Sequence, residues 1–210
     1  MVEPSKSLMA HFHEIPWVAE ELSEPDLIIR EPASRVFDPN LRAFEFWSST
    51  LHSSTTVPFF VGAYHLPDGS DTQGLNAEIA HDRAIGPHIV TRARFFLTLG
   101  RGVSTIDKNL CHGGMVAAIF DECAGAICWA NKAHGFLEFL PQVTQSLNIT
   151  YLKPVPTMST IAVTALLETK DGVKMVVDLT LADKAGTALA KAEAVFVSIN
   201  KRKKRRNEKL

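Results

Sequence analysis

Two neighbouring glycines and an aspartate are the residues of this chain best suited to chemistry. Gly113 and Gly114 follow His112 and open an apolar stretch that runs to residue 131, with Asp121 and Glu122 as its only charged residues. If the stretch is helical, the unpaired backbone N–H groups at its start can receive negative charge that develops on a substrate oxygen. Glycines there let a substrate approach the backbone closely, because no Cβ is in the way.

Asp121 would place a carboxylate on a buried helix, where a charge is costly unless it is paired or neutralised. Its helical neighbours are all small and leave space beside it: Ala117, Ala118, Ala124 and Gly125. This clearing favours a general base or a nucleophile. The alternative is a structural aspartate, capped or salt-bridged in the core. Glu122 points about 100° away around the helix, which favours a structural ion-pair partner.

The helix that carries these residues is predicted to be the centre of the fold. From Gly114 to Asn131 it would be about 26 Å long and apolar on most of its circumference, which is typical of a core helix. We judge its apolar run too short and too interrupted by charge for a membrane span. Apolar and polar residues alternate before it, from residue 88 to 97, which indicates a strand with one buried face.

Strand-like runs follow the helix, with Asp171-Gly172 as a hairpin signal between two of them. The runs cover about 142–153, 159–169, 173–183 and 187–199. Together with the preceding strand they predict an α+β fold, in which a curved antiparallel sheet of five to six strands wraps the long helix.

The chain is predicted to have three parts: an N-terminal extension at 1–86, a domain at 87–200 and a basic tail at 201–210. The extension begins with a proline-rich arm that has at most short helices. A helix at about 39–52 and an edge strand at 57–64 follow. His11 and His13 could bind a metal, but no further ligands cluster near them, so solvated histidines are favoured and no metal site is predicted.

The motifs resemble those of the HGG-motif hotdog-fold acyl-CoA thioesterases, including the phenylacetate-degradation type and the thioesterase-superfamily relatives. The matching residues are His112-Gly113-Gly114, Asp121 nine positions after the histidine, and Thr144 four positions before an N-I-T-Y-x-x-P strand at 148–154. The resemblance covers about 88–199. Several members have an asparagine where this chain has Ile106, and Asn109 is out of register with that position.

The resemblance implies thioester hydrolysis without a cofactor, by a site shared between two chains. Gly113 and Gly114 would bind the oxyanion, Asp121 would act as general base or nucleophile, Thr144 would hold the attacking water, and His112 would position the helix start. Thr144 could equally be an ordinary strand residue, and His112 a structural one. The implied partners are an acyl-CoA substrate and a second copy of the chain, as a homodimer or a dimer of dimers.

Two other functions fit the same features. A hotdog hydratase or dehydratase would act on acyl thioesters at a carbon–carbon bond, and it would usually use a histidine together with an acid. No second histidine stands near Asp121 in the helix. A non-catalytic acyl-CoA or lipid-binding protein would need the pocket without the carboxylate. Release of a free thiol from an acyl-CoA separates hydrolysis from both.

Charge and cysteine content bear on the partners and the compartment of the protein. The net charge is −1, of which the tail contributes +6 and the other residues −7, so no overall field favours nucleic acid. The tail could act as a nuclear-type signal, contact an acidic membrane, or solubilise the chain end as a disordered segment, which is the commonest role. Three cysteines and no apolar N-terminal leader predict a reducing, intracellular compartment, most simply the cytoplasm, with mitochondria or peroxisomes as alternatives.

Overall fold

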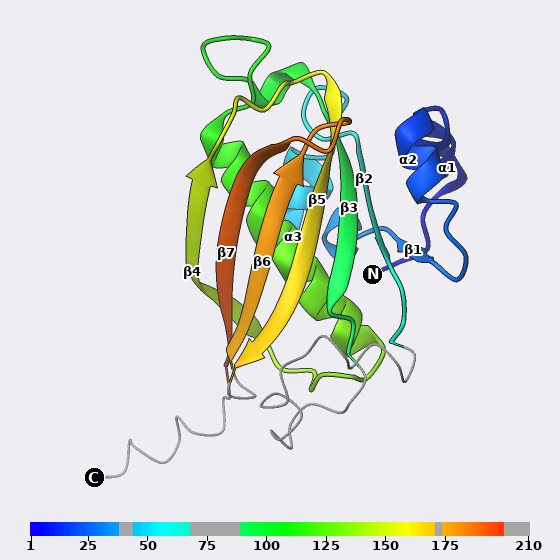
Figure 1. Ribbon diagram of the computed structural model, residues 1–210, viewed down its shortest axis with the longest axis vertical. Coiled ribbons are helices and arrows are strands. Elements are labelled where there is room, and N and C mark those ends of the chain that lie inside the picture. The colour runs from blue at the N-terminus through cyan, green and yellow to red at the C-terminus, as the bar shows by residue number, and fades with distance from the viewer. Residues whose placement is uncertain (38–43, 68–88, 171–173, 200–210) are drawn as a thin grey trace.

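One long helix lies against a curved antiparallel sheet in the computed structural model, which describes residues 1–37, 44–67, 89–170 and 174–199 (Figure 1). The helix is α3 (Gly113–Ala133). The strands are β1 (Ile28–Arg30), β2 (Phe59–Tyr64), β3 (Arg92–Leu99), β4 (Gln142–Tyr151), β5 (Ser159–Lys170), β6 (Lys174–Ala182) and β7 (Ala188–Ser198). They form one sheet in the order β1-β2-β3-β5-β6-β7-β4.

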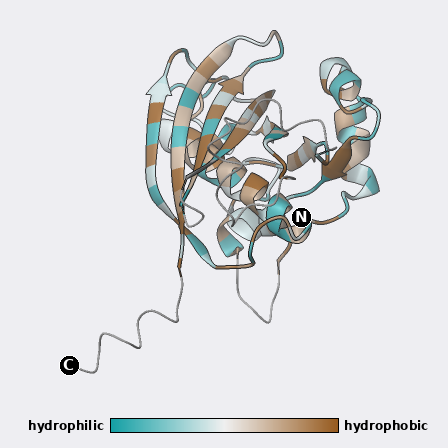
Figure 2. Ribbon diagram, turned by 60° about the horizontal axis from the view of Figure 1, so that its bottom comes forward, coloured by the Kyte–Doolittle hydropathy of each residue, from teal (hydrophilic) through white to brown (hydrophobic). Residues whose placement is uncertain are grey.

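The predicted α+β fold is confirmed, with seven strands instead of five to six. The difference comes from the extension, because β1 pairs with β2 and β2 pairs with β3. The four strands expected after the helix all form, and each pairs antiparallel with its neighbours. Hydrophobic and hydrophilic residues alternate along several of them (Figure 2), as expected for strands with one buried face.

The core lies between α3 and the sheet. Helix residues such as Ile119, Phe120 and Ile127 are fully buried against Phe95 and Leu97 of β3 and against β5, β6 and β7. By length and composition alone α3 would pass as a membrane span, so our sequence argument against a span was too strong. Its packing against the sheet identifies it as a core helix, since a core helix of this length has the same apolar composition as a membrane span.

Two short helices of the extension, α1 (Lys6–His13) and α2 (Pro16–Glu21), lie beside β2 and pack on part of the other face of the sheet (Figure 1). Their apolar side chains form a second core with strand residues that point away from α3: Leu8, Phe12, Val18 and Leu22 with Val61, Ala63, Phe96 and Ala162. Side chains of β2 thus alternate between two cores, which buries the strand on both faces. This is why its sequence, FFVGAY, is apolar throughout.

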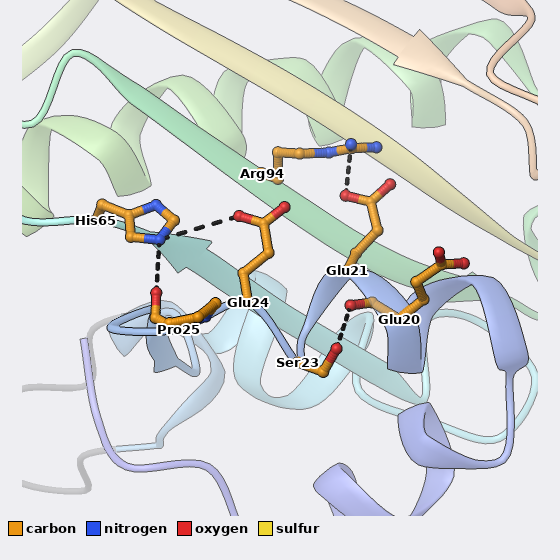
Figure 3. Close-up of polar contacts among 7 residues, drawn as sticks. All are labelled: Glu20, Glu21, Ser23, Glu24, Pro25, His65 and Arg94. Atoms are coloured by element: carbon orange, nitrogen blue, oxygen red, sulfur yellow. Dashed lines mark hydrogen bonds and ion pairs between the residues drawn. The ribbon is translucent and has the colours of Figure 1, made fainter.

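Polar contacts fasten the extension to β2 and β3 (Figure 3). Glu21 forms an ion pair with Arg94 at 2.5 Å, and His65 Nε2 lies 3.0 Å from the carbonyl oxygen of Pro25. Of the two histidines predicted to be solvated, His13 is exposed, whereas His11 is only partly exposed: its ring stacks on Phe59 with centroids 3.7 Å apart, and its Nε2 lies 2.8 Å from a threonine hydroxyl on β3.

The helix predicted at about 39–52 is described only from residue 44 onward, where a short π-helical turn spans Phe46–Thr50. Trp47 and Leu51 of this segment are buried in the main core. The predicted strand at 57–64 is β2. The domain boundary at 86 and the basic tail lie outside the described residues, and both stay predictions.

All three cysteines are free and buried. Burial raises the pKa of Cys111 to about 11 and that of Cys128 to about 12, and it also raises the pKa of Cys123. Because the thiolate is the reactive form, we expect the folded protein to resist a thiol reagent near neutral pH and to react at all three cysteines once unfolded. Mass spectrometry after labelling measures this, and fast labelling of the native protein would contradict it.

Candidate active site

Asp121 and Thr144, 23 residues apart in sequence, meet between helix and sheet. Asp121 lies in the middle of α3, and Thr144 lies near the start of β4. The Thr144 hydroxyl donates a hydrogen bond to Asp121 Oδ1 at 2.6 Å. The pairing of β4 with β7 shifts register between Thr144 and Ser146, and such bulges can change the direction in which a strand side chain points.

A cavity of about 370 Å³ opens beside this pair. Gly125 and Trp129 line it from α3, and Phe196 lines it from β7. It is mostly apolar apart from the Asp121–Thr144 pair and a few other polar groups, as in most small-molecule sites. Among the described residues no histidine lines it.

Glu122 adds a second carboxyl group to the cavity wall. Ser34 of the extension donates a hydrogen bond to Glu122 Oε1. Burial raises the pKa of Glu122 to about 7; the Ser34 hydrogen bond opposes this shift, the charge of Asp121 adds to it, and Arg35 opposes it. The structure places no ion pair on Glu122 within the described ranges. The predicted ion-pair role is therefore replaced by a hydroxyl contact.

The start of α3 holds the other predicted residues. His112 is the N-cap, and its Nδ1 accepts a hydrogen bond from the Gly114 N–H at 3.0 Å. The Gly113 N–H has no hydrogen-bond partner in the part of the chain that the structure describes. Gly113 is held from its other side, since the Tyr151 hydroxyl donates to its carbonyl oxygen at 2.9 Å. Of the two glycines, Gly113 has the available backbone donor.

A second hollow, of about 500 Å³, lies at this end of the helix. The N-cap His112 lines it together with Gly114 and Ala118 of α3. Among the described residues, none lines both this hollow and the Asp121 cavity. Eight residues separate Gly113 from Asp121, which is about 12 Å along the helix axis. One chain therefore brings Asp121 and Thr144 together, and separately His112, Gly113 and Gly114.

Two positions that differ from the family pattern lie near the helix start. Ile106 is fully exposed, and the backbone carbonyl of Asn109 accepts a hydrogen bond from the Thr157 N–H. Neither lines the Asp121 cavity. Sequence reasoning named Tyr151 only as part of a motif, and gave Ser34 no role.

Residues 108–190 match the model of the thioesterase superfamily. This stretch contains all five predicted site residues, from His112 to Thr144. The resemblance seen in the sequence is confirmed at the level of the superfamily. No curated protein matches the chain.

Several solved structures are similar to about half of this chain. One is a hypothetical thioesterase with coenzyme A from Streptococcus pneumoniae, 15% identical over 52% of this chain and 80% of that one, with a TM-score of 0.46. The PaaI protein of the Escherichia coli phenylacetic acid degradation operon is 18% identical over 51% of this chain and 76% of that one, with a TM-score of 0.44. Thioesterase superfamily member 2 of Mus musculus is 17% identical over 52% of this chain and 82% of that one, with a TM-score of 0.44.

Proposed function

We propose that this protein hydrolyses acyl-CoA thioesters to the free acid and CoA. The observation that carries the proposal is the Asp121 carboxylate, held by the Thr144 hydroxyl at 2.6 Å beside a cavity of about 370 Å³. Both residues lie inside the stretch that matches the thioesterase superfamily. A carboxylate that is fixed in position beside an apolar cavity suits general-base or nucleophilic attack on a bound ester carbonyl.

The roles of the site residues follow from their hydrogen bonds. The Thr144 hydroxyl already donates its proton to Asp121. The Thr144 oxygen can therefore accept a hydrogen bond from a water molecule whose other proton points to the carboxylate. Asp121 then takes that proton as the water oxygen attacks the carbonyl carbon. The Gly113 N–H stabilises the oxyanion, with help from the helix dipole. The C–S bond breaks, and the thiolate of CoA regains the proton from Asp121.

Direct attack by Asp121 is the other route. The carboxylate oxygen would bond to the acyl carbon and expel the thiolate as a mixed anhydride forms. Water would then cleave the anhydride. Both routes need Gly113 and Asp121 to reach the same carbonyl group.

We propose that a two-fold dimer meets this need, with Gly113 of one chain facing Asp121 of the other. The supporting observation is the edge of the sheet at β4, which pairs only with β7 among the described strands. Val143 and Tyr151 of this strand and Leu152 just after it are 45%, 54% and 48% exposed. An unpaired edge that carries apolar side chains suits pairing with a second copy.

A panel of acyl-CoAs from acetyl to palmitoyl, with aromatic thioesters included, tests the proposed function. We expect steady release of free thiol from some members of the panel. Binding of acyl-CoA without thiol release from any of them would contradict hydrolysis and favour an acyl-CoA-binding protein. Loss of the double bond of an enoyl-CoA without thiol release would favour a hydratase.

Thr144→Val removes the hydroxyl but keeps the shape of the side chain. A hydrogen bond to a charged group contributes about 1.5–3 kcal/mol, so we expect kcat to fall by roughly 10-fold to 100-fold, less than for loss of the carboxylate. KM should change little, because the hydroxyl contacts water and Asp121 and not the substrate. Thr180→Val on β6 is the matched control, because Thr180 lies away from the β4 edge and lines neither hollow, and it should keep wild-type kinetics. Unchanged kcat in Thr144→Val would make Thr144 an ordinary strand residue.

A further inference from the structure

The Asp121 cavity is closed on one side by the N-terminal extension. Pro32, Ala33 and Ser34 line it together with residues of α3, β4 and β7. These three residues lie more than 70 positions before the start of the thioesterase-superfamily match at residue 108. One wall of the cavity therefore comes from a part of this chain outside the superfamily region.

This wall is held at both ends, because Glu31 just before it forms a β-bridge with Val2 and two adjacent residues hold its other end. Ser34 bonds to Glu122 on α3, and the next residue, Arg35, is buried at 3% exposure. The Arg35 guanidinium donates to backbone carbonyl oxygens at 2.7–3.4 Å, which belong to Trp47, Leu51, Val57 and Pro58. An arginine with several backbone acceptors is held in one position, so residues 32–35 form a fixed wall.

The facing side of the cavity follows the helix. Asp121, Gly125 and Trp129 are four residues apart, so they lie in a row along one face of α3. A Cβ added to Gly125 would meet nothing within 4 Å. A glycine in mid-helix costs about 1 kcal/mol relative to alanine, and here it leaves open space one turn beyond the carboxylate. From Asp121 to Trp129 the row extends about 12 Å.

The lining and the size of the cavity suit an acyl chain. Pro32, Ala33, Trp129 and Phe196 give it apolar walls, and it continues directly from the carboxylate proposed to act on the acyl carbon. Its volume of about 370 Å³ is near the lower end of the range of about 300–1,000 Å³ typical of ligand pockets.

We propose that residues 32–34 are the specificity wall of the acyl site. The acyl chain lies along α3 from Asp121 towards Trp129, with this wall on its other side, and the wall restricts the site to apolar acyl groups of short to medium length. The inference rests on the proposed function, since it names the substrate class of the same site.

Ala33→Leu tests the wall by narrowing the cavity from the extension. We expect kcat/KM for octanoyl-CoA and longer substrates to fall by at least about 10-fold, the effect of one or more misplaced methylenes in a tight pocket, while butanoyl-CoA is affected by less than about threefold. Ala19→Leu is the matched control, because Ala19 is also half-buried in the extension but lies on α2, away from the cavity. It should leave the chain-length profile unchanged.

Ser34→Ala tests the wall in the opposite direction and adds no bulk that could prevent folding. Without the bond to Glu122 the wall is released from α3, and the ratio of kcat/KM for dodecanoyl-CoA to that for butanoyl-CoA should rise several-fold. Equal changes for all chain lengths, in both Ala33→Leu and Ser34→Ala, would overturn the proposal. Circular dichroism and thermal unfolding of each variant identify any loss of folding.

A binding measurement separates failure of the wall from failure of the proposed function. If the wild type releases no thiol from any acyl-CoA, hydrolysis is wrong, and affinities for a series of non-hydrolysable S-alkyl-CoA thioethers then test the wall. Weaker binding of octyl-CoA to Ala33→Leu than to the wild type, with butyl-CoA unaffected, supports the wall as part of a binding site. No binding of any thioether to the wild type overturns both proposals.

Discussion

Replacing Asp121 by asparagine is expected to lower kcat for acyl-CoA hydrolysis by about 10²–10⁴-fold, the usual contribution of a positioned acid–base group. The amide keeps the size of the side chain, and its oxygen can still accept the hydrogen bond from Thr144. It can neither take a proton from water nor attack a carbonyl carbon. Folding should be unaffected or slightly stabilised, because a partly buried charge is removed.

Kinetics and thermal unfolding of the same preparation measure both parts of this expectation. Asp178→Asn is the matched control, since Asp178 is an exposed aspartate on β6 and does not line the cavity. It should retain wild-type turnover. Near-normal turnover in folded Asp121→Asn would remove the catalytic assignment and leave Asp121 as a structural residue bonded to Thr144.

The parts of the fold that the sequence predicted are those whose pattern is local. The apolar run predicted a helix from Gly114 to Asn131, and α3 spans Gly113–Ala133. The later strands show alternation over many residues, and turn residues separate them, so their positions were predicted to within a few residues. Such patterns depend only on which faces of an element are buried.

The strand at 57–64 was predicted, but the way the extension packs on the sheet was not, because its burial depends on distant partners. β1 is three residues long, too short for a periodic pattern. β2 is buried on both faces, since α1 and α2 cover the face opposite α3, so it shows no alternation. Nothing local indicates that the N-terminal helices lie on the sheet.

Some residues of the candidate site were also predicted from the sequence, and others were not. The small helical neighbours singled out Asp121, the family resemblance singled out Thr144, and the structure brings the two into contact. Ser34 and Glu122 are 88 positions apart, and no spacing rule connects residues so distant. The sequence also did not show that Gly113, and not Gly114, has the available backbone donor. This depends on which of the two N–H groups donates a hydrogen bond to the His112 ring. Rotamers and tertiary contacts decide such details.

Mixing two inactive variants is expected to restore activity if the site is shared between chains. Gly113→Pro removes the backbone N–H that lacks a partner among the described residues. Proline is favoured at the first position of a helix. His112 before it has φ −64° and ψ 135°, a conformation that a following proline accepts. A Cβ at this position would lie 3.5 Å from the Tyr151 hydroxyl, an ordinary contact. The variant should therefore fold.

The second variant, Asp121→Ala, keeps Gly113 intact. After the two variants are unfolded together and reassociate at random, about half of the dimers should be mixed. Each mixed dimer has one site with both groups, formed by Gly113 of the Asp121→Ala chain and Asp121 of the Gly113→Pro chain. Its other site has neither group. Activity should then return to about a quarter of the wild-type value, while each variant refolded alone stays inactive.

Different tags on the two variants show whether mixed dimers form. Co-purification of the tags with activity no higher than that of the separate variants would contradict the shared site, because both groups would then have to come from the same chain. Absence of any dimer by light scattering would contradict it as well. Recovery of activity would assign the helix start and the Asp121 cavity to opposite halves of one site. This fits the two hollows of a single chain, which have no lining residue in common in the part that the structure describes.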